Sequence, residues 1–266
     1  MNTNSNLYTV IYTSIVVVLV AAVLAFVSQS LKSKQEANEK ADTISQMLTA
    51  AGFGTKQEFQ AMGNAAVLDT YGSEIAEAFT VNAKGEKVAD LDLASREVFS
   101  PKLLKAQNYN IKGGKDFAVP VFIFKNKITV VPVYGAGLWG PVWGYIAFEP
   151  DGKTIRGAYF DHESETAGLG AKIKDDPAFQ AEFSGEQAFF GEERIFAIVK
   201  GGAPVDAEGK SLKDNQIDAI TGATMTSNGL DAAINSWLGA YTSYFKACGK
   251  SCTDCEAEPK AEEEQK

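Results

Sequence analysis

The segment from Asp218 to Ser227 (DAITGATMTS) places four hydroxyl side chains around a Gly-Ala pair, directly before an amphipathic helix. A helix N-terminus has unpaired N–H groups and a partial positive charge, so it favours a phosphate even without a lysine. Gly222 and Ala223 would let a phosphate ester approach the backbone closely. Ordinary capping is the alternative, because the hydroxyl of Thr226 or Ser227 can accept the free N–H groups of the first turn. The segment therefore predicts a helix start that either binds an anion or is simply capped.

Two more segments could contact a ligand. Residues 134–144 hold four glycines and two tryptophans, but they lack the lysine of a phosphate-binding loop, and either tryptophan could belong to the core. Residues 161–172 form a polar, glycine-containing loop after an expected strand, where ligand-contacting loops tend to lie. In this loop Lys172 could neutralise an anion or remain solvated. His162 is interpreted as a turn residue rather than a catalyst.

Composition excludes several classes of function. With 34 acidic and 25 basic side chains the formal charge is −9, so the chain presents no basic footprint for nucleic acid. His162 is its one histidine, and its three cysteines lie within the last twenty residues. This excludes a His-rich metal centre or a Cys–His nucleophile inside the fold. We therefore expect neither catalytic side chains nor metal ligands, and any chemistry must come from a borrowed cofactor.

Strand and turn patterns indicate what positions these segments. Residues 117–124 and 127–134 are β-branched and aromatic runs separated by Lys125-Asn126, which predicts a hairpin. Residues 145–148 and 154–160 flank a Glu-Pro-Asp-Gly-Lys turn and predict a second hairpin, and residues 194–200 predict a short strand.

A late helix is marked by one apolar face, made by Leu230, Ile234, Trp237, Leu238, Tyr241 and Phe245. Strand pairs mixed with unevenly spaced helices predict an α+β domain with a mostly antiparallel sheet. No regular βαβ alternation supports a dinucleotide-binding fold.

The N-terminus is apolar enough to cross a membrane. Leu7 to Val27 is a run of 21 residues dominated by Val, Ile, Leu and Ala, and no charged side chain precedes Lys32. A helix of this length spans roughly 31 Å, the thickness of a hydrocarbon layer. A cleaved signal peptide is the alternative, but it needs a basic start and a shorter apolar core. We therefore predict a retained single transmembrane anchor.

The segment after the anchor continues as a helix. Residues 35–53 keep helix formers and spaced apolar positions, then stop at Gly52-Phe-Gly54, which predicts a stalk. Lys32, Lys34 and Lys40 would place the following chain in the cytoplasm by the positive-inside rule, although interleaved glutamates dilute this signal.

The other end is an acidic tail, for which we predict disorder. Residues 256–266 hold five Glu and two Lys, with no large apolar side chain. Three cysteines, Cys248, Cys252 and Cys255, precede them, so one disulfide would leave a free thiol. A metal or cluster site completed by a partner is the alternative.

Three segments together resemble the flavin-binding domain of the C subunit of the Na+-translocating NADH:quinone reductase: Gly135 to Gly140 (GAGLWG), Glu163 to Ala171 (ESETAGLGA) and Thr221 to Thr224 (TGAT). The single anchor and the total length are similar too. The resemblance covers nearly the whole chain and leaves out the cysteine-bearing tail. Its most specific part is the (Ser/Thr)-Gly-Ala-Thr signature.

The resemblance implies FMN bound covalently to Thr224, through a phosphoester bond made by a dedicated flavin transferase. Thr221, Gly222 and Ala223 match the rest of the signature, and Asp218 matches the acidic position that opens the transferase recognition sequence. The other two segments are similar to loops that line the isoalloxazine. They imply cofactor-binding roles for Leu138, Trp139, Gly140, Glu165, Thr166, Gly168, Leu169 and Lys172.

The same resemblance implies an electron-carrying subunit of a sodium-translocating NADH:quinone oxidoreductase. Its partners would be an iron–sulfur subunit upstream and a second flavin subunit downstream, while NADH and quinone would meet other subunits. The soluble domain would lie in the periplasm, held by one pass through the bacterial inner membrane, and we follow this orientation over the charge signal. The expected parts are an anchor at 1–31, a stalk helix at 32–55, a periplasmic FMN-binding domain at 56–247 and a Cys-containing acidic tail at 248–266, for which we expect disorder.

Two alternatives remain open. One is a protein like the flavin-bearing G subunit of the Rnf ferredoxin:NAD+ reductase, which shares the Gly-Ala-Thr signature and the single anchor. The other is a membrane-anchored scaffold without a redox group, in which the Thr-rich segment is only a capped helix start.

Overall fold

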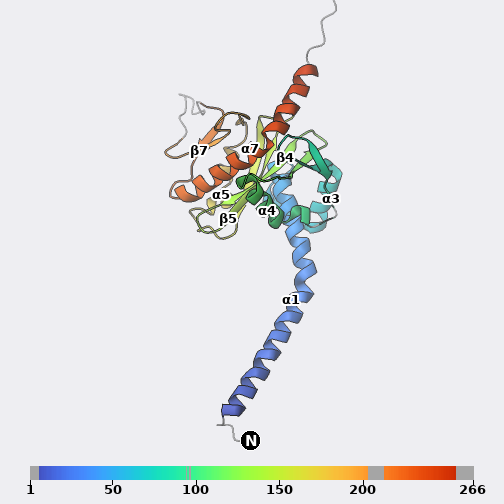
Figure 1. Cartoon of the computed structure of the whole chain (residues 1–266), viewed down its shortest axis with the longest axis vertical. Coiled ribbons are helices and arrows are strands. Elements are labelled where there is room, and N and C mark those ends of the chain that lie inside the picture. The colour runs from blue at the N-terminus through green and yellow to red at the C-terminus, as the bar shows by residue number, and fades with distance from the viewer. Residues whose placement is uncertain (1–5, 94, 96, 203–212, 256–266) are drawn as a thin grey trace, which may run out of the picture.

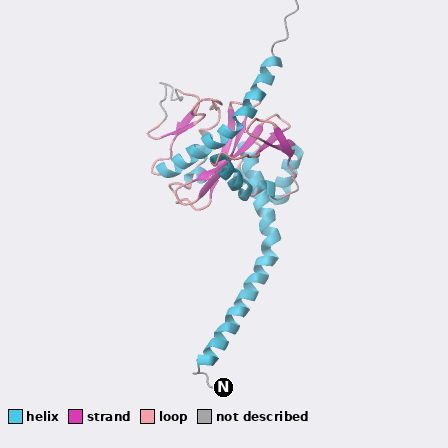
Figure 2. Cartoon of the chain, viewed as in Figure 1, coloured by secondary structure: helices cyan, strands magenta, loops and turns pink. Residues whose placement is uncertain are grey.

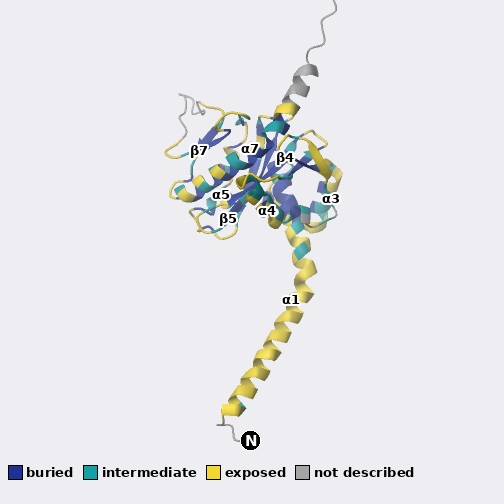
Figure 3. Ribbon diagram, viewed as in Figure 1, coloured by how far each residue is buried: buried dark blue, intermediate teal, exposed yellow. Residues whose placement is uncertain are grey.

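The computed structural model describes residues 6–93, 95, 97–202 and 213–255, with the backbone alone for 97 and 249–255. It begins with α1 (Asn6–Ala50), a continuous helix of 45 residues. The N-terminal half of α1 projects from the rest of the molecule, and its apolar side chains are exposed (Figures 1 and 3). This half is long and apolar enough to cross a membrane. The expected apolar helix at the N-terminus is therefore present.

The C-terminal end of α1 packs inside the domain. Ile44, Met47 and Leu48 are fully buried, and they belong to a core cluster that also contains strand residues such as Phe122 and Tyr145. The second half of the expected stalk thus serves as a core helix. The physical reason is the apolar face that recurs at helical spacing and has a sheet to cover.

The domain is built on a six-stranded antiparallel sheet with the order β2-β1-β3-β4-β5-β6. Figure 2 shows strands in the middle of the domain with helices around them. Its strands are β1 (Ile75–Val81), β2 (Lys87–Asp90), β3 (Val119–Phe124), β4 (Thr129–Ala136), β5 (Pro141–Phe148) and β6 (Ile155–His162). The expected α+β class with a mostly antiparallel sheet is confirmed. Both expected hairpins, β3–β4 and β5–β6, are also present.

The turns of these hairpins follow from their residues. Between β3 and β4, Lys127 adopts a positive φ of 66°, and its N–H donates to the Phe124 carbonyl. Between β5 and β6, Asp151 Oδ1 accepts the N–H groups of Lys153 and Thr154, while Gly152 has a φ of 69°. Asp and Gly suit these positions because Asp bonds its own turn and Gly tolerates positive φ.

Helices cover both faces of the sheet. One face carries α7 (Thr224–Cys255) and α4 (Pro101–Lys112). The other carries the end of α1 with α2 (Lys56–Met62) and α3 (Asn64–Glu74). Strand residues alternate accordingly, so Val131 and Ile146 face α7 whereas Val130 and Tyr145 face α1.

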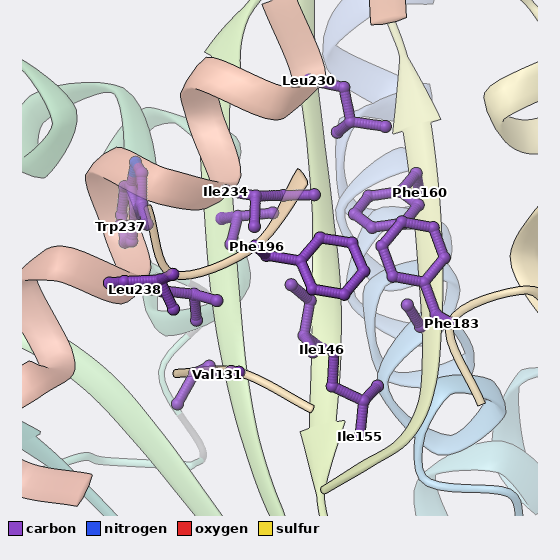
Figure 4. Close-up of a cluster of buried hydrophobic side chains, with 14 of the residues drawn as sticks. Val131, Ile146, Ile155, Phe160, Phe183, Phe196, Leu230, Ile234, Trp237 and Leu238 are labelled. Atoms are coloured by element: carbon purple, nitrogen blue, oxygen red, sulfur yellow. The ribbon is translucent and has the colours of Figure 1, made fainter. Parts of the chain in front are cut away.

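The apolar face expected for the late helix is the centre of the α7-side core. All six of its predicted residues are at most 3% exposed, and Leu230, Ile234, Trp237 and Leu238 meet sheet side chains there (Figure 4). The helix begins at Thr224 and continues through Cys255, so its backbone enters the segment for which we expect disorder. Residues 256–266 of that tail lie outside the described residues. Cys248 is half-buried.

Smaller elements complete the domain. They are the 3-10 turn η1 (Glu97–Phe99), α5 (Lys172–Asp175), α6 (Pro177–Ala181), β7 (Ala197–Val199) and β8 (Gln216–Asp218). β7 lies within the run where we expect a strand, and it pairs with β8 in parallel. The sequence pattern did not indicate β8, because three residues are too few for an alternation to be recognised.

Candidate functional site

The Thr221–Thr224 segment forms the turn into α7. Thr221 and Gly222 are exposed, Ala223 is buried, and Thr224 is half-buried as the first residue of the helix. Gly222 has a φ of 82°, a conformation that favours glycine. The Ala223 N–H donates to the Ile220 carbonyl, which closes the turn. The signature residues therefore present an open backbone and one hydroxyl at a helix N-terminus.

The hydroxyl groups that could have capped this helix do other work. Ser227 Oγ accepts the N–H of Ile220, which precedes the helix, and Thr226 Oγ1 donates to Glu165 Oε2 at 2.6 Å. Thr226 and Ser227 are each 1% exposed. These two residues therefore do not cap the first turn of α7. Both lie within that turn, and their side chains are buried.

Glu165 joins the three segments that resemble a flavin site. Its Oε2 accepts the Thr226 hydroxyl of α7. Its Oε1 accepts the N–H of Trp139 at 2.9 Å, in the glycine loop that joins β4 and β5 (residues 137–140). Burial of the carboxyl raises its pKa, but hydrogen bonds from Thr226 and from the backbone of residues 138–140 outweigh that effect and hold the pKa below the usual value. An ionised carboxylate thus lies buried at the junction of the segments.

Glycines make this junction possible. A Cβ at Gly137 would meet Glu165 Oε1, and a Cβ at Gly170 would meet both Glu165 Oε2 and Thr226 Oγ1. A Cβ at Gly140 would meet Ser164 Oγ, whose own hydrogen bond goes to the Trp139 carbonyl. Each of these glycines therefore allows a close approach that any larger residue would prevent.

Large apolar side chains around this junction are exposed. Trp139 is 67% exposed, and Leu138, Leu169 and Met225 are 49%, 43% and 61% exposed. Leu169 lies over the signature turn, because a Cβ at Gly222 would be 3.1 Å from its Cδ2. Exposed apolar groups on three converging segments indicate a surface that a planar apolar ligand can cover.

The remaining predicted site residues lie at the edges of this surface. Thr166 and Gly168 are exposed in the 163–171 loop, where the Thr166 carbonyl accepts the N–H groups of Leu169 and Ala171. Lys172 begins α5 and is half-buried. Asp218 is exposed at the end of β8, and its N–H donates to Glu182 Oε2 at 2.9 Å. The structure therefore brings the three segments together, with Asp218 before the signature turn.

A cavity of about 660 Å³ opens beside the glycine loop, between α4 and the ends of β4 and β5. Tyr134, Trp143 and Glu163 line one side, and α4 contributes Lys102 and Lys105. None of the predicted site residues lines this cavity.

Comparisons with known proteins agree with this geometry. Residues 137–239 match the FMN-binding domain family, a range that runs from the glycine loop into α7. The Na+-translocating NADH-quinone reductase C subunit from Haemophilus ducreyi is 29% identical over 256 residues, which cover 87% of this chain and 93% of that protein. The C subunit from Parabacteroides distasonis, known from a crystal structure, is 34% identical in sequence to this chain. The two structures superimpose with a TM-score of 0.64 over 81% of this chain and 96% of the P. distasonis chain.

This chain belongs to the NqrC family, the C subunits of the Na+-translocating NADH-quinone reductase. The crystal structure of Shewanella oneidensis NqrC, 26% identical with a TM-score of 0.62, covers 80% of this chain and 99% of its own. The family resemblance predicted from the three segments is thereby confirmed.

Sequence reasoning did not assign the residues that tie this NqrC-family site together. Thr226 bonds Glu165 from a distant position in the chain, Gly170 of the same loop leaves room for that contact, and Met225 adds exposed apolar surface. A buried threonine within a helix gives no signal in one sequence, because its partner lies 61 residues away.

Proposed function

We propose that this NqrC-family protein is the electron-carrying FMN subunit of a Na+-translocating NADH-quinone reductase and that it holds FMN by a phosphoester to Thr224. The match to an FMN-binding domain and membership in the NqrC family support FMN as the cofactor. The observation that carries the covalent link is the place of Thr224: it opens α7 beside an exposed apolar surface built from two other segments.

The residues present fit an FMN. The unpaired N–H groups at the start of α7 favour the phosphate. Leu138, Trp139, Leu169 and Met225 offer the apolar surface that a planar ring would cover. Gly168 leaves the backbone open, since a Cβ there would meet nothing within 4 Å. When bound, FMN supplies the ability to accept and release electrons one at a time.

The chain's own residues orient and shield the cofactor. Glu165 fixes the backbone of Trp139 relative to α7, and this sets where the exposed indole stands. Exposed apolar side chains exclude water from a ring placed on them, and exclusion of water strengthens nearby electrostatic interactions. We assign no acid–base step to these residues, because electron transfer through a flavin needs none from them.

Attachment requires another protein. A threonine hydroxyl is a weak nucleophile unless a base activates it. His162 offers no free base, because its Nδ1 accepts the Glu165 N–H at 3.2 Å and Nε2 is then the protonated ring nitrogen. We therefore propose a separate flavin transferase that recognises the segment beginning at Asp218, in which Asp218, Thr221 and Gly222 are exposed.

We further propose the arrangement in the membrane. The first half of α1 would be a single inner-membrane anchor, and residues 56–247 with the end of α1 would form the FMN-binding domain in the periplasm. Electrons would arrive from an iron–sulfur subunit and leave to a second flavin subunit of the same complex.

Replacing Thr224 tests the covalent link. When the chain is produced together with a flavin transferase, its denatured polypeptide should fluoresce as a flavin on a gel, because a phosphoester survives denaturation. The Thr224→Leu variant should lose that band completely, and its mass should be that of the polypeptide alone.

The matched control is Thr221→Val in the same turn. It removes a hydroxyl without removing the attachment point, so part of the band should remain. A full flavin band in the Thr224→Leu variant would refute the assignment of Thr224.

A further inference from the structure

A chain of polar contacts, buried except at the half-buried His162, runs from α1 to the start of α7. Gln46 of α1 donates from Nε2 to Asp161 Oδ2 at 3.0 Å. Asp161 is the next-to-last residue of β6, and its Oδ1 accepts the His162 N–H at 2.7 Å. Because Gln46 and Asp161 lie 115 positions apart in the chain, their contact ties α1 directly to the strand that leads into the 163–171 loop.

The chain continues through the loop. His162 Nδ1 accepts the Glu165 N–H at 3.2 Å, so Nδ1 is the unprotonated ring nitrogen. Glu165 Oε2 then accepts the Thr226 hydroxyl, two residues after Thr224. Four contacts in series thus connect Gln46 with the helix start that carries the proposed attachment residue.

Burial makes these contacts specific. Gln46 is 2% exposed, Asp161 4%, Glu165 8% and Thr226 1%. A buried carboxylate has lost its solvation by water, and the free-energy cost is not offset if a protein donor is also lost. Arrangements that keep every donor in place are therefore strongly favoured. Asp161 has a second anchor in Lys174 of α5, whose Nζ lies 2.8 Å from Oδ1.

Gln46 is itself held from the α1 side. Its Nε2 also donates to Asp42 Oδ2 at 2.9 Å, and Asp42 forms an ion pair of 2.6 Å with Lys56 of α2. Gln46 Oε1 is buried without a hydrogen-bond partner among the described residues. The Gln46 amide therefore acts as a donor, and Asp161 is its acceptor on the sheet.

We propose that Gln46 and Asp161 are positioning residues of the flavin site, so that the last turns of the anchor helix set the conformation of the 163–171 loop. The predicted effect on FMN rests on the proposed function. The conformation of the loop can be measured without FMN. The positioning role makes the buried end of α1, which continues from the proposed anchor, a structural part of the cofactor site.

The test compares Gln46→Met with Thr43→Val in the full-length protein. Gln46→Met keeps the side-chain length and removes the donor to Asp161. Thr43 is the matched control, because it lies one turn earlier on α1, is 8% exposed, and donates to the Phe99 carbonyl outside this chain of contacts. Amide hydrogen exchange over residues 163–171 is the measurement.

We expect Gln46→Met to speed exchange in the loop by on the order of tenfold, the effect of leaving one buried acceptor unpaired. Thr43→Val should leave the loop at the wild-type rate. Loop exchange at the wild-type rate in Gln46→Met, or equal acceleration in both variants, would overturn the proposal. Gln46→Leu replaces Gln46→Met if the latter does not fold.

Asp161→Asn provides a conservative rescue. The Asn side-chain oxygen can still accept from Gln46 Nε2, so the α1 link is kept while the charge is lost. Loop exchange should therefore stay closer to wild type than in Asp161→Ala. Equal exchange in these two variants would contradict the role of the link.

Flavin readouts separate this inference from the function it rests on. In flavin-loaded protein, Gln46→Met should lower the fluorescence anisotropy of the flavin and move its midpoint potential toward that of free FMN. If the wild-type chain carried no covalent flavin, the assignment of Thr224 would be wrong. Amide exchange would still decide whether Gln46 sets the conformation of the 163–171 loop. A loosened loop with unchanged anisotropy and potential would overturn the positioning role.

Discussion

At the residue scale, the site depends on one buried carboxylate. Glu165 accepts from Trp139 of the glycine loop and from Thr226 of α7, and the glycines around it leave room for those contacts. Its oxygens are thus engaged with protein donors, and the exposed Trp139 and Leu169 are left to meet a ligand. Glu165 therefore sets the position of Trp139 relative to the start of α7.

Glu165→Gln should lower the free energy of unfolding by about 1–3 kcal/mol at neutral pH, because the replacement loses a charged acceptor in a buried place. The folded-state pKa of Glu165 lies below its usual value of 4.5, so its contribution is present above that value and is lost as pH falls through the folded pKa. The difference between variant and wild type should therefore shrink in acid. Denaturant unfolding at neutral and acidic pH measures it.

Glu163→Gln is the matched control for this experiment. Glu163 is exposed in the same loop, so its replacement should change stability by less than about 0.5 kcal/mol at either pH. An effect of Glu165→Gln that stayed constant through the acid range would contradict the assigned ionisation.

At the element scale, the site requires close contact between α7 and the end of β4. A Cβ at Gly229 would meet the Ala136 carbonyl, and a Cβ at Gly135 would meet Ala233. These glycines let the helix backbone approach the strand just before the glycine loop begins. The start of α7, and with it Thr224, is placed by this contact.

Gly229→Ala should therefore lower the free energy of unfolding by about 1–3 kcal/mol, because overpacking against Ala136 outweighs the gain in helix propensity. Gly239→Ala is the control on the same helix. Nothing lies within 4 Å of a Cβ there, so that variant should gain about 1 kcal/mol from propensity. Thermal unfolding distinguishes the two, and equal gains in both variants would show that the helix does not pack this closely.

At the scale of the whole molecule, α1 serves two environments. Its first half is exposed and apolar, whereas Ile44, Met47 and Leu48 fill the core under the sheet. The proposed membrane anchor and the folded domain therefore share one continuous helix (Figure 1).

A chain that begins at Lys34 should remain folded and soluble, since it loses no buried residue of α1. A chain that begins at Lys56 should not fold stably. Each large buried apolar side chain that it loses is worth about 2–5 kcal/mol, and together they approach the whole stability of a domain. Circular dichroism during heating compares the two chains, and a cooperative transition in the shorter one would contradict the core role of α1.

The proposed periplasmic orientation has its own test. Alkaline phosphatase fused after Cys255 should be active, because it folds only after export, and a green fluorescent protein fused there should be dark when exported unfolded. The reverse pattern would favour the cytoplasmic orientation indicated by Lys32, Lys34 and Lys40.

The sequence alone determined the parts of this protein that depend on local patterns. The apolar run in α1, the two hairpins with their Asn and Asp-Gly turns, and the apolar face from Leu230 to Phe245 each follow from residues close together in the chain. The signature Thr221–Thr224 was equally visible, because the four residues are consecutive.

Tertiary structure decided what joins these parts. The contacts Gln46–Asp161, Glu165–Trp139 and Glu165–Thr226 link residues far apart in the chain, and no periodicity or spacing marks such partners. The same holds for the end of α1, which has the pattern of a stalk in the sequence and becomes core only because a sheet built from later residues covers it. Burial depends on which surfaces meet, and that is settled only when the whole chain has folded.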